Sequence, residues 1–160
     1  MYSAFLNDRP QLRFPCIPHH GQIIQVTSWT KLNEEDSVGG KTNYSINLEP
    51  RYGPLELIDV QRLVDACKEP WYNQTLCRVN ESVVRLGIVQ GEFHWHKHDL
   101  EDEFFYVVEG RLLIDLEGRT VELLPKQGFT VPKGTVHRTR APERTVILMM
   151  EAAGVKPSGD

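Results

Sequence analysis

From about residue 75 onward, apolar and polar residues alternate along short segments of the chain. Side chains in a strand point alternately to opposite faces, so this period of two predicts β-strands with one buried face. Turn-forming residues such as Gly110 and Pro125 separate the segments. The predicted strands span residues 82–89, 91–98, 103–109, 111–116, 120–124, 128–131, 136–140 and 145–150. Many short strands joined by turns predict an all-β sandwich or barrel.

One short helix is predicted before these strands, over residues 59–68. Asp59 is a favourable N-cap, because its carboxylate can accept hydrogen bonds from free amides of the first turn. Pro70 ends the helix. The spacing i, i+3, i+4, i+7 gives one apolar face, formed by Val60, Leu63, Val64 and Cys67.

Residues 1–55 have weaker patterning and contain five prolines. Residues 23–29 form the one convincing strand there, and residues 44–48 alternate as a second. We therefore expect an N-terminal arm over residues 1–55, packed on a barrel domain of residues 56–160 or on a partner subunit.

Composition limits the partners of this 160-residue chain, which is long enough for one hydrophobic core. Its 18 Lys and Arg against 22 Asp and Glu give a net charge of −4, so we expect no nucleic-acid partner. No apolar run approaches the roughly 18 residues of a membrane span, and we expect no membrane partner. The widely spaced Cys16, Cys67 and Cys77 suit a reducing compartment, and the first residues lack a signal-peptide pattern, so a cytoplasmic location is expected.

Three of the six histidines fall within five residues, as His94, His96 and His98. In a strand over residues 91–98 they would share one face. If the next strand pairs with it as a hairpin, the carboxylate of Glu103 returns to the histidine pair. Two imidazoles and a carboxylate are typical of a site for a first-row transition metal. The alternative is a polar strip facing solvent.

A fourth ligand is predicted downstream at His137. Pro132 and Gly134 form a rigid turn ahead of it, which would place one imidazole reproducibly. His94 has two open interpretations, because it could be an outer partner of the metal ligands or line the wall of the site.

The sequence resembles the cupin superfamily, in particular its small single-domain members of the mannose-6-phosphate-isomerase-like type. Two spaced motifs carry the resemblance, His96-x-His98-x4-Glu103-x6-Gly110 and Pro132-x-Gly134-x2-His137. The leading glycine of the first motif departs by one position, at Gly91. The second motif lacks its leading glycine and its final asparagine, since Lys126 and Ala141 stand there. The resemblance covers residues 56–154.

This resemblance implies a double-stranded β-helix, or jelly-roll barrel, with one divalent transition metal (Zn, Fe, Mn or Ni) inside. It implies that His96, His98, Glu103 and His137 hold the metal and that a small molecule binds in the open mouth. Such domains commonly form homodimers through added N-terminal strands, which would give residues 1–55 a role.

The remaining site predictions concern chemistry. His94 is the candidate acid or base, and the substrate pocket is predicted to include Trp95, Phe105 and Arg85. The favoured function is an enzyme that uses the metal as a Lewis acid on a small carbonyl, sugar-like or polyketide-like compound, as an isomerase, cyclase, lyase or decarboxylase would. An iron-dependent dioxygenase and a non-catalytic binding or sensing protein are the alternatives.

Overall fold

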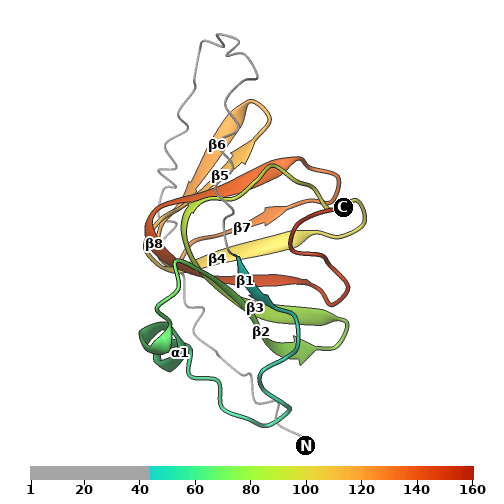
Figure 1. Cartoon of the computed structure of the whole chain (residues 1–160). Coiled ribbons are helices and arrows are strands. Elements are labelled where there is room, and N and C mark those ends of the chain that lie inside the picture. Colours follow the sequence, from blue (N-terminus) through green and yellow to red (C-terminus); the bar gives the residue numbers. More distant parts are fainter. Residues whose placement is uncertain (1–43) are drawn as a thin grey trace, which may run out of the picture.

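The computed structural model describes residues 44–160 (Figure 1). These residues form eight strands and one helix: β1 (Ser45–Asn47), α1 (Val60–Ala66), β2 (Trp71–Val79), β3 (Ser82–Glu92), β4 (Glu103–Glu109), β5 (Leu112–Leu116), β6 (Arg119–Leu123), β7 (Gly128–Val131) and β8 (His137–Ala152). The predicted all-β fold with one short helix is confirmed. Within residues 44–160, no helix has the length and apolar character required to cross a membrane.

Strand β8 organises the sheet. It pairs antiparallel with β3, β4 and β5, and the sheet runs in the order β1-β2-β3-β8-β4-β7. The hairpin of β5 and β6 joins this sheet through the first residues of β8. Figure 1 shows β8 curving from the β5–β6 hairpin to β3, so that the strands enclose one interior.

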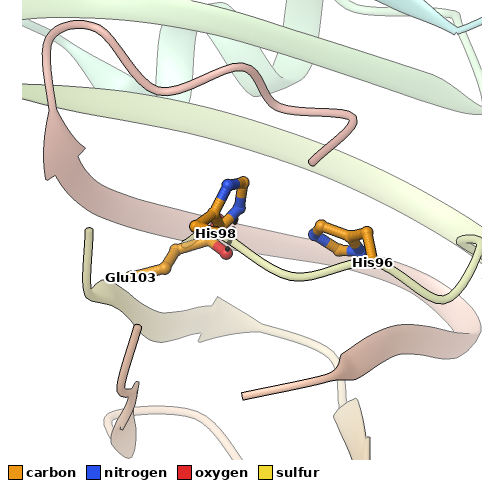
Figure 2. Close-up of side chains that lie close together, drawn as sticks. All are labelled: His96, His98 and Glu103. Carbon is orange, nitrogen blue, oxygen red and sulfur yellow. Dashed lines mark ion pairs between the residues drawn. The ribbon is translucent and has the colours of Figure 1, made fainter. Parts of the chain in front are cut away.

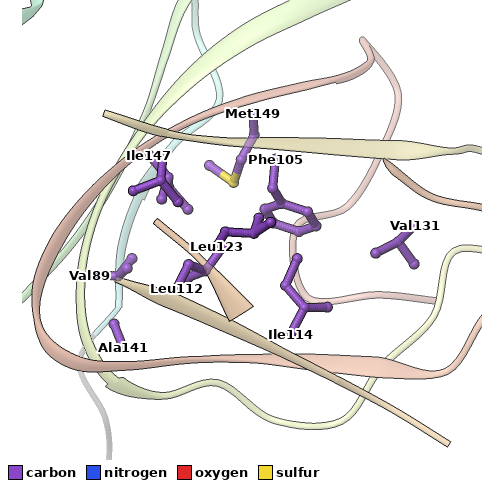
Figure 3. Close-up of a cluster of buried hydrophobic side chains, with 10 residues drawn as sticks. Val89, Phe105, Leu112, Ile114, Leu123, Val131, Ala141, Ile147 and Met149 are labelled. Atoms are coloured by element: carbon purple, nitrogen blue, oxygen red, sulfur yellow. The ribbon is translucent and has the colours of Figure 1, made fainter. Parts of the chain in front are cut away.

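The interior is filled by the alternating apolar residues that the sequence pattern predicts. Phe105 and Val107 of β4 point inward with Ile147 and Met149 of β8, and all four side chains are buried. Figure 3 shows Phe105 surrounded by aliphatic side chains from several strands. Gly87 of β3 makes room for this packing, because a Cβ there would lie 2.7 Å from Ile147 Cγ1.

Helix α1 covers the outer face of the sheet. The Asp59 carboxylate accepts a hydrogen bond from the Arg62 amide at 3.1 Å, which confirms the predicted N-cap. Leu63 and Val64 are buried against Leu76 of β2 and neighbouring residues of β3 and β8. The helix therefore closes a second apolar cluster outside the barrel.

The structure differs from the predicted strands in two places. Residues 93–98 are not a strand, because β3 ends at Glu92 after a register shift between Val89 and Gly91. The break predicted at residues 141–142 is also wrong, since β8 runs continuously through Pro142. Three residues of β8, 142–144, stand opposite the single residue Gln90 of β3, so the proline lies in a bulge where no amide donor is needed.

Part of the predicted N-terminal arm belongs to the sheet. Residues 45–47 form β1, which pairs in parallel with residues 72–74 of β2. The strand predicted over residues 23–29 lies outside the described residues. The homodimer that this strand was expected to build stays a prediction.

Candidate metal centre

The predicted ligands come from three separate parts of the fold. His96 and His98 lie in the irregular segment that follows β3, and Glu103 is the first residue of β4. His137 begins β8 and exchanges two backbone hydrogen bonds of 2.9 Å with His96. The predicted hairpin between residues 91–98 and the next strand is wrong, because β4 pairs with β7 and β8. The segment carrying His96 and His98 is attached to β8 instead.

The side chains of His96, His98 and Glu103 nevertheless converge. One potential ligand atom from each lies within 4.8 Å of the other two (Figure 2). The Glu103 carboxylate Oε2 lies 3.5 Å from Nε2 of His98 and 3.4 Å from Nε2 of His137. The imidazole rings of His96 and His137 have centroids 4.3 Å apart. Three candidate ligands therefore meet around one small volume, and His137 borders it next to Glu103 and His96.

Backbone carbonyls fix the orientation of two imidazoles. His137 Nδ1 lies 3.0 Å from the Thr135 oxygen, and His96 Nδ1 lies 3.1 Å from the His94 oxygen. A carbonyl oxygen can only accept, so each Nδ1 carries the proton and donates. In the neutral imidazole, Nε2 is then left with a lone pair, which is how metal-bound histidines are usually held.

The inner atoms of the cluster lack satisfactory partners among the described residues. His98 Nε2, His137 Nε2 and Glu103 Oε2 are all buried without a hydrogen bond of good geometry. Their separations of 3.4–3.5 Å are long for charge-assisted hydrogen bonds. A lone pair on His137 facing a carboxylate oxygen needs positive charge between them, as a proton or a metal ion. The residues therefore fit one divalent ion bound by nitrogen and oxygen donors.

The pKa values of His96 and Glu103 reflect the burial of these side chains and their closeness to His98 and His137. Burial and the neighbouring His137 lower the pKa of His96 to about 4, which keeps this imidazole neutral and able to bind a metal near pH 7. Burial would raise the pKa of Glu103, but His137 and His98 outweigh it and hold that pKa at about 2. Glu103 is therefore a carboxylate at all ordinary pH values.

The cluster opens into a pocket with a mostly apolar wall. His96 and Glu103 line it together with Phe105, and the role of Phe105 in substrate binding stays a prediction. The other apolar lining residues are Tyr44, Ile46, Trp71, Val89, Phe93, Ile147, Met149 and Pro157. A molecule in this pocket would touch the metal ligands while most of its surface contacts hydrocarbon.

One charged pocket residue was missed by the sequence analysis. Glu151 of β8 lines the pocket and is 3% exposed. The β4–β8 register pairs Phe104 with Met150, and one further step places Glu151 opposite Glu103. Its carboxylate forms a buried ion pair with Arg85. The only sequence signal was an acidic residue directly after the predicted strand 145–150, in phase with its inward-facing positions.

Arg85 was predicted to line the substrate pocket, but it is not among the residues that line the metal-centre pocket. The side chain is 2% exposed, and its guanidinium contacts the carboxyl group of Glu151. Burial, reinforced by the charge of Glu103, raises the pKa of Glu151 to about 7 in spite of Arg85. An acidic group that titrates near neutrality therefore stands beside the candidate metal ligands.

The two remaining predicted residues lie at the edge of the site. His94 is exposed, its ring centroid lies 5.4 Å from that of His96, and its Nε2 donates to the Ser158 carbonyl oxygen at 2.8 Å. Trp95 is 48% exposed, and the Arg138 guanidinium lies 5.1 Å from its ring centroid. Trp95 lines a separate surface hollow with Leu116 and is not among the residues of the metal-centre pocket.

Comparisons with known proteins agree with this architecture. The family model of the cupin domain matches residues 84–151. Protein YdbB of Bacillus subtilis (strain 168) is 43% identical over 90 residues, which cover 56% of this chain and 80% of YdbB. The polyketide synthase CurC of Streptomyces cyaneus is 39% identical over 66 residues, which cover 39% of this chain and 43% of CurC.

A solved structure supports the same assignment. The crystal structure of a cupin-2 domain-containing protein from Shewanella frigidimarina NCIMB 400 superposes with a TM-score of 0.58 at 29% identity. The match covers 60% of this chain and 94% of the Shewanella protein. Together with the barrel and the two histidine motifs, these similarities show that the chain belongs to the cupin superfamily.

Proposed function

We propose that this cupin is an enzyme that binds one divalent metal ion and acts on a small carbonyl compound. The observation that carries the proposal is the position of His96 and Glu103, which contribute to the metal cluster and to the wall of the pocket. His98 and His137 would complete the ligand set. A divalent ion held there would act as a Lewis acid that polarises a carbonyl oxygen.

The pocket wall favours a substrate with an apolar body. Aromatic rings from Trp71, Phe93 and Phe105 line it, whereas the uncharged polar side chains on the wall are Ser45, Asn73 and Thr139. This composition supports a polyketide-like or simple carbonyl compound over a heavily hydroxylated sugar. The similarity to CurC, named as a polyketide synthase, points the same way for the matched part of the chain.

Glu151 is the residue best placed to move a proton. Its carboxylate lies in the pocket, and a pKa of about 7 allows it both to accept and to release a proton near neutral pH. Proton removal beside a polarised carbonyl is the common step of isomerases, cyclases and many lyases. The predicted role of His94 as acid or base would require a substrate that reaches out of the pocket, because His94 is exposed.

Metal analysis is the first test. Protein purified without a nickel column and loaded with Zn²⁺ is expected to hold one ion per chain by elemental analysis. His96→Ala and His98→Ala are each expected to lose most of it, since fewer donors bind more weakly. His94→Ala removes an imidazole that lies outside the ligand cluster and should still hold a full equivalent at saturating Zn²⁺. Unchanged stoichiometry in both ligand variants would refute the site.

Turnover is the second test. The metal-loaded protein is screened by mass spectrometry against enolisable ketones and β-dicarbonyl compounds, with and without a chelator. We expect product formation that stops on chelation and returns on reloading. Turnover that survives chelation would overturn the proposal. Oxygen uptake confined to the iron(II) form would favour a dioxygenase, and a ligand-raised melting temperature without product would favour a binding protein.

A further inference from the structure

The metal-ligand segment has unusually little regular structure. Residues 93–98 form one isolated bridge, between His96 and His137. Two further backbone hydrogen bonds join this segment to the chain around the start of β8. Phe93 donates to Thr139 at 2.8 Å, and Gly134 donates to the His98 oxygen at 2.7 Å. A segment attached along one edge needs support on the other if two imidazoles are to be held in a fixed geometry.

That support comes from residues 156–160, which we name the clasp. Three hydrogen bonds join it to residues 94–99: His94 Nε2 to the Ser158 oxygen at 2.8 Å, Asp160 N to the Lys97 oxygen at 3.1 Å, and Asp99 N to the Asp160 carboxylate at 2.9 Å. The residues that make these contacts, at positions 94, 97 and 99, flank His96 and His98 in the sequence. Figure 1 shows the end marked C beside the yellow-green loop that leads into β4.

Gly159 makes the closest approach. Its φ is +86°, in the left-handed region that favours glycine, and its amide closes a turn onto the Lys156 oxygen at 2.9 Å. A Cβ at Gly159 would lie 2.6 Å from His96 Cβ and 3.0 Å from the Lys97 oxygen. The backbone of the clasp thus packs closely against a candidate metal ligand, and a side chain at Gly159 would force His96 or the clasp to shift.

We propose that the clasp positions His96 and His98 for metal binding, with Gly159 as the positioning residue. The inference rests on the metal site proposed above. Pro157 of the same segment lines the pocket, so the clasp also forms part of the substrate-facing wall. Ligand geometry and pocket shape are therefore linked through five residues that supply no ligand to the cluster.

Gly159→Ala tests the proposal, with Gly118→Ala as its matched control. Both glycines have positive φ, but a Cβ at Gly118, in the turn of the β5–β6 hairpin, meets nothing within 4 Å. Loss of support around metal ligands typically weakens metal binding about 10- to 100-fold. We expect Gly159→Ala to weaken Zn²⁺ binding by about tenfold or more in calorimetric titration. We also expect it to alter the visible spectrum of the Co²⁺ form, whereas Gly118→Ala leaves both unchanged.

Hydrogen exchange of the metal-free proteins separates failure of the clasp from failure of the metal site. The proposal predicts faster exchange of amides in residues 93–99 in Gly159→Ala alone. If the wild-type protein binds no Zn²⁺, the proposed function fails, and exchange still decides whether the clasp orders the segment. Wild-type affinity, an unaltered Co²⁺ spectrum and unchanged exchange in Gly159→Ala would overturn the clasp. Equal losses in Gly118→Ala would overturn it too, because general backbone strain would then explain the effect.

Discussion

The buried carboxyl of Glu151 gives the metal-free protein a specific dependence of stability on pH. Its pKa rises from 4.5 to about 7 on folding, so the folded state retains a proton that the unfolded state releases. Below pH 4.5 Glu151 is protonated in both states, and its contribution to the free energy of unfolding is fully present. As the pH rises toward 7, ionisation favours the unfolded state. At about 1.4 kcal/mol per pKa unit, the total loss is about 3 kcal/mol.

Glu151→Gln should remove this dependence, because glutamine cannot ionise. The free energy of unfolding is measured by urea titration at pH 5 and pH 8 in the presence of a chelator. We expect the variant to gain about 2–3 kcal/mol relative to the wild type across that range, with most of the gain below pH 7.5. Glu117→Gln, at an exposed residue without an ion pair among the described residues, is the control. If the difference in free energy of unfolding between variant and wild type is the same at pH 5 and pH 8 within about 0.5 kcal/mol, Glu151 is ionised throughout and the reasoning is refuted.

Two further predictions concern the fold. Gly87→Ala should lower the free energy of unfolding by about 1–3 kcal/mol in urea titration, because its Cβ would lie 2.7 Å from the buried Ile147 Cγ1. A stabilised variant would show that Ile147 can shift at no cost. Asp59→Ala should cost about 1 kcal/mol by thermal denaturation, since the Arg62 amide loses its 3.1 Å acceptor. Asp59→Asn, which keeps an acceptor, should recover most of that loss.

Local sequence pattern was sufficient to predict most of the strands and the set of side chains that come together. The alternation in β4 depends only on which face is buried, and it is visible in the sequence. His96, His98 and His137 come together as predicted, although residues 93–98 are not a strand. The reason is that attachment to β8, and not a hairpin, carries the segment to Glu103. The spacing of the residues predicted which side chains lie together, whereas the predicted pairing partner of residues 91–98 was wrong.

The predictions failed where long-range register decides the outcome. Glu151 lies 48 positions after Glu103, and only the pairing of β4 with β8 brings the two together. Pro142 looks like a strand break, but a bulge in β8 leaves its missing amide proton without consequence. The clasp was missed for a related reason. Pro157, Ser158 and Gly159 have the composition of an unstructured end, and their contacts with residues 94–97 depend on the path of the whole barrel.

The continuous course of β8 has a consequence for how the barrel comes apart. Its first residues pair with β5, and its last residues pair with both β3 and β4. Neither half of the barrel can detach without giving up hydrogen bonds to the same strand. We therefore expect unfolding to be a single cooperative transition, with the amides of residues 145–150 exchanging only when the whole barrel opens. His137 begins this strand and Glu151 lies near its end, so we expect these two residues of the candidate site to keep their positions until the whole barrel opens.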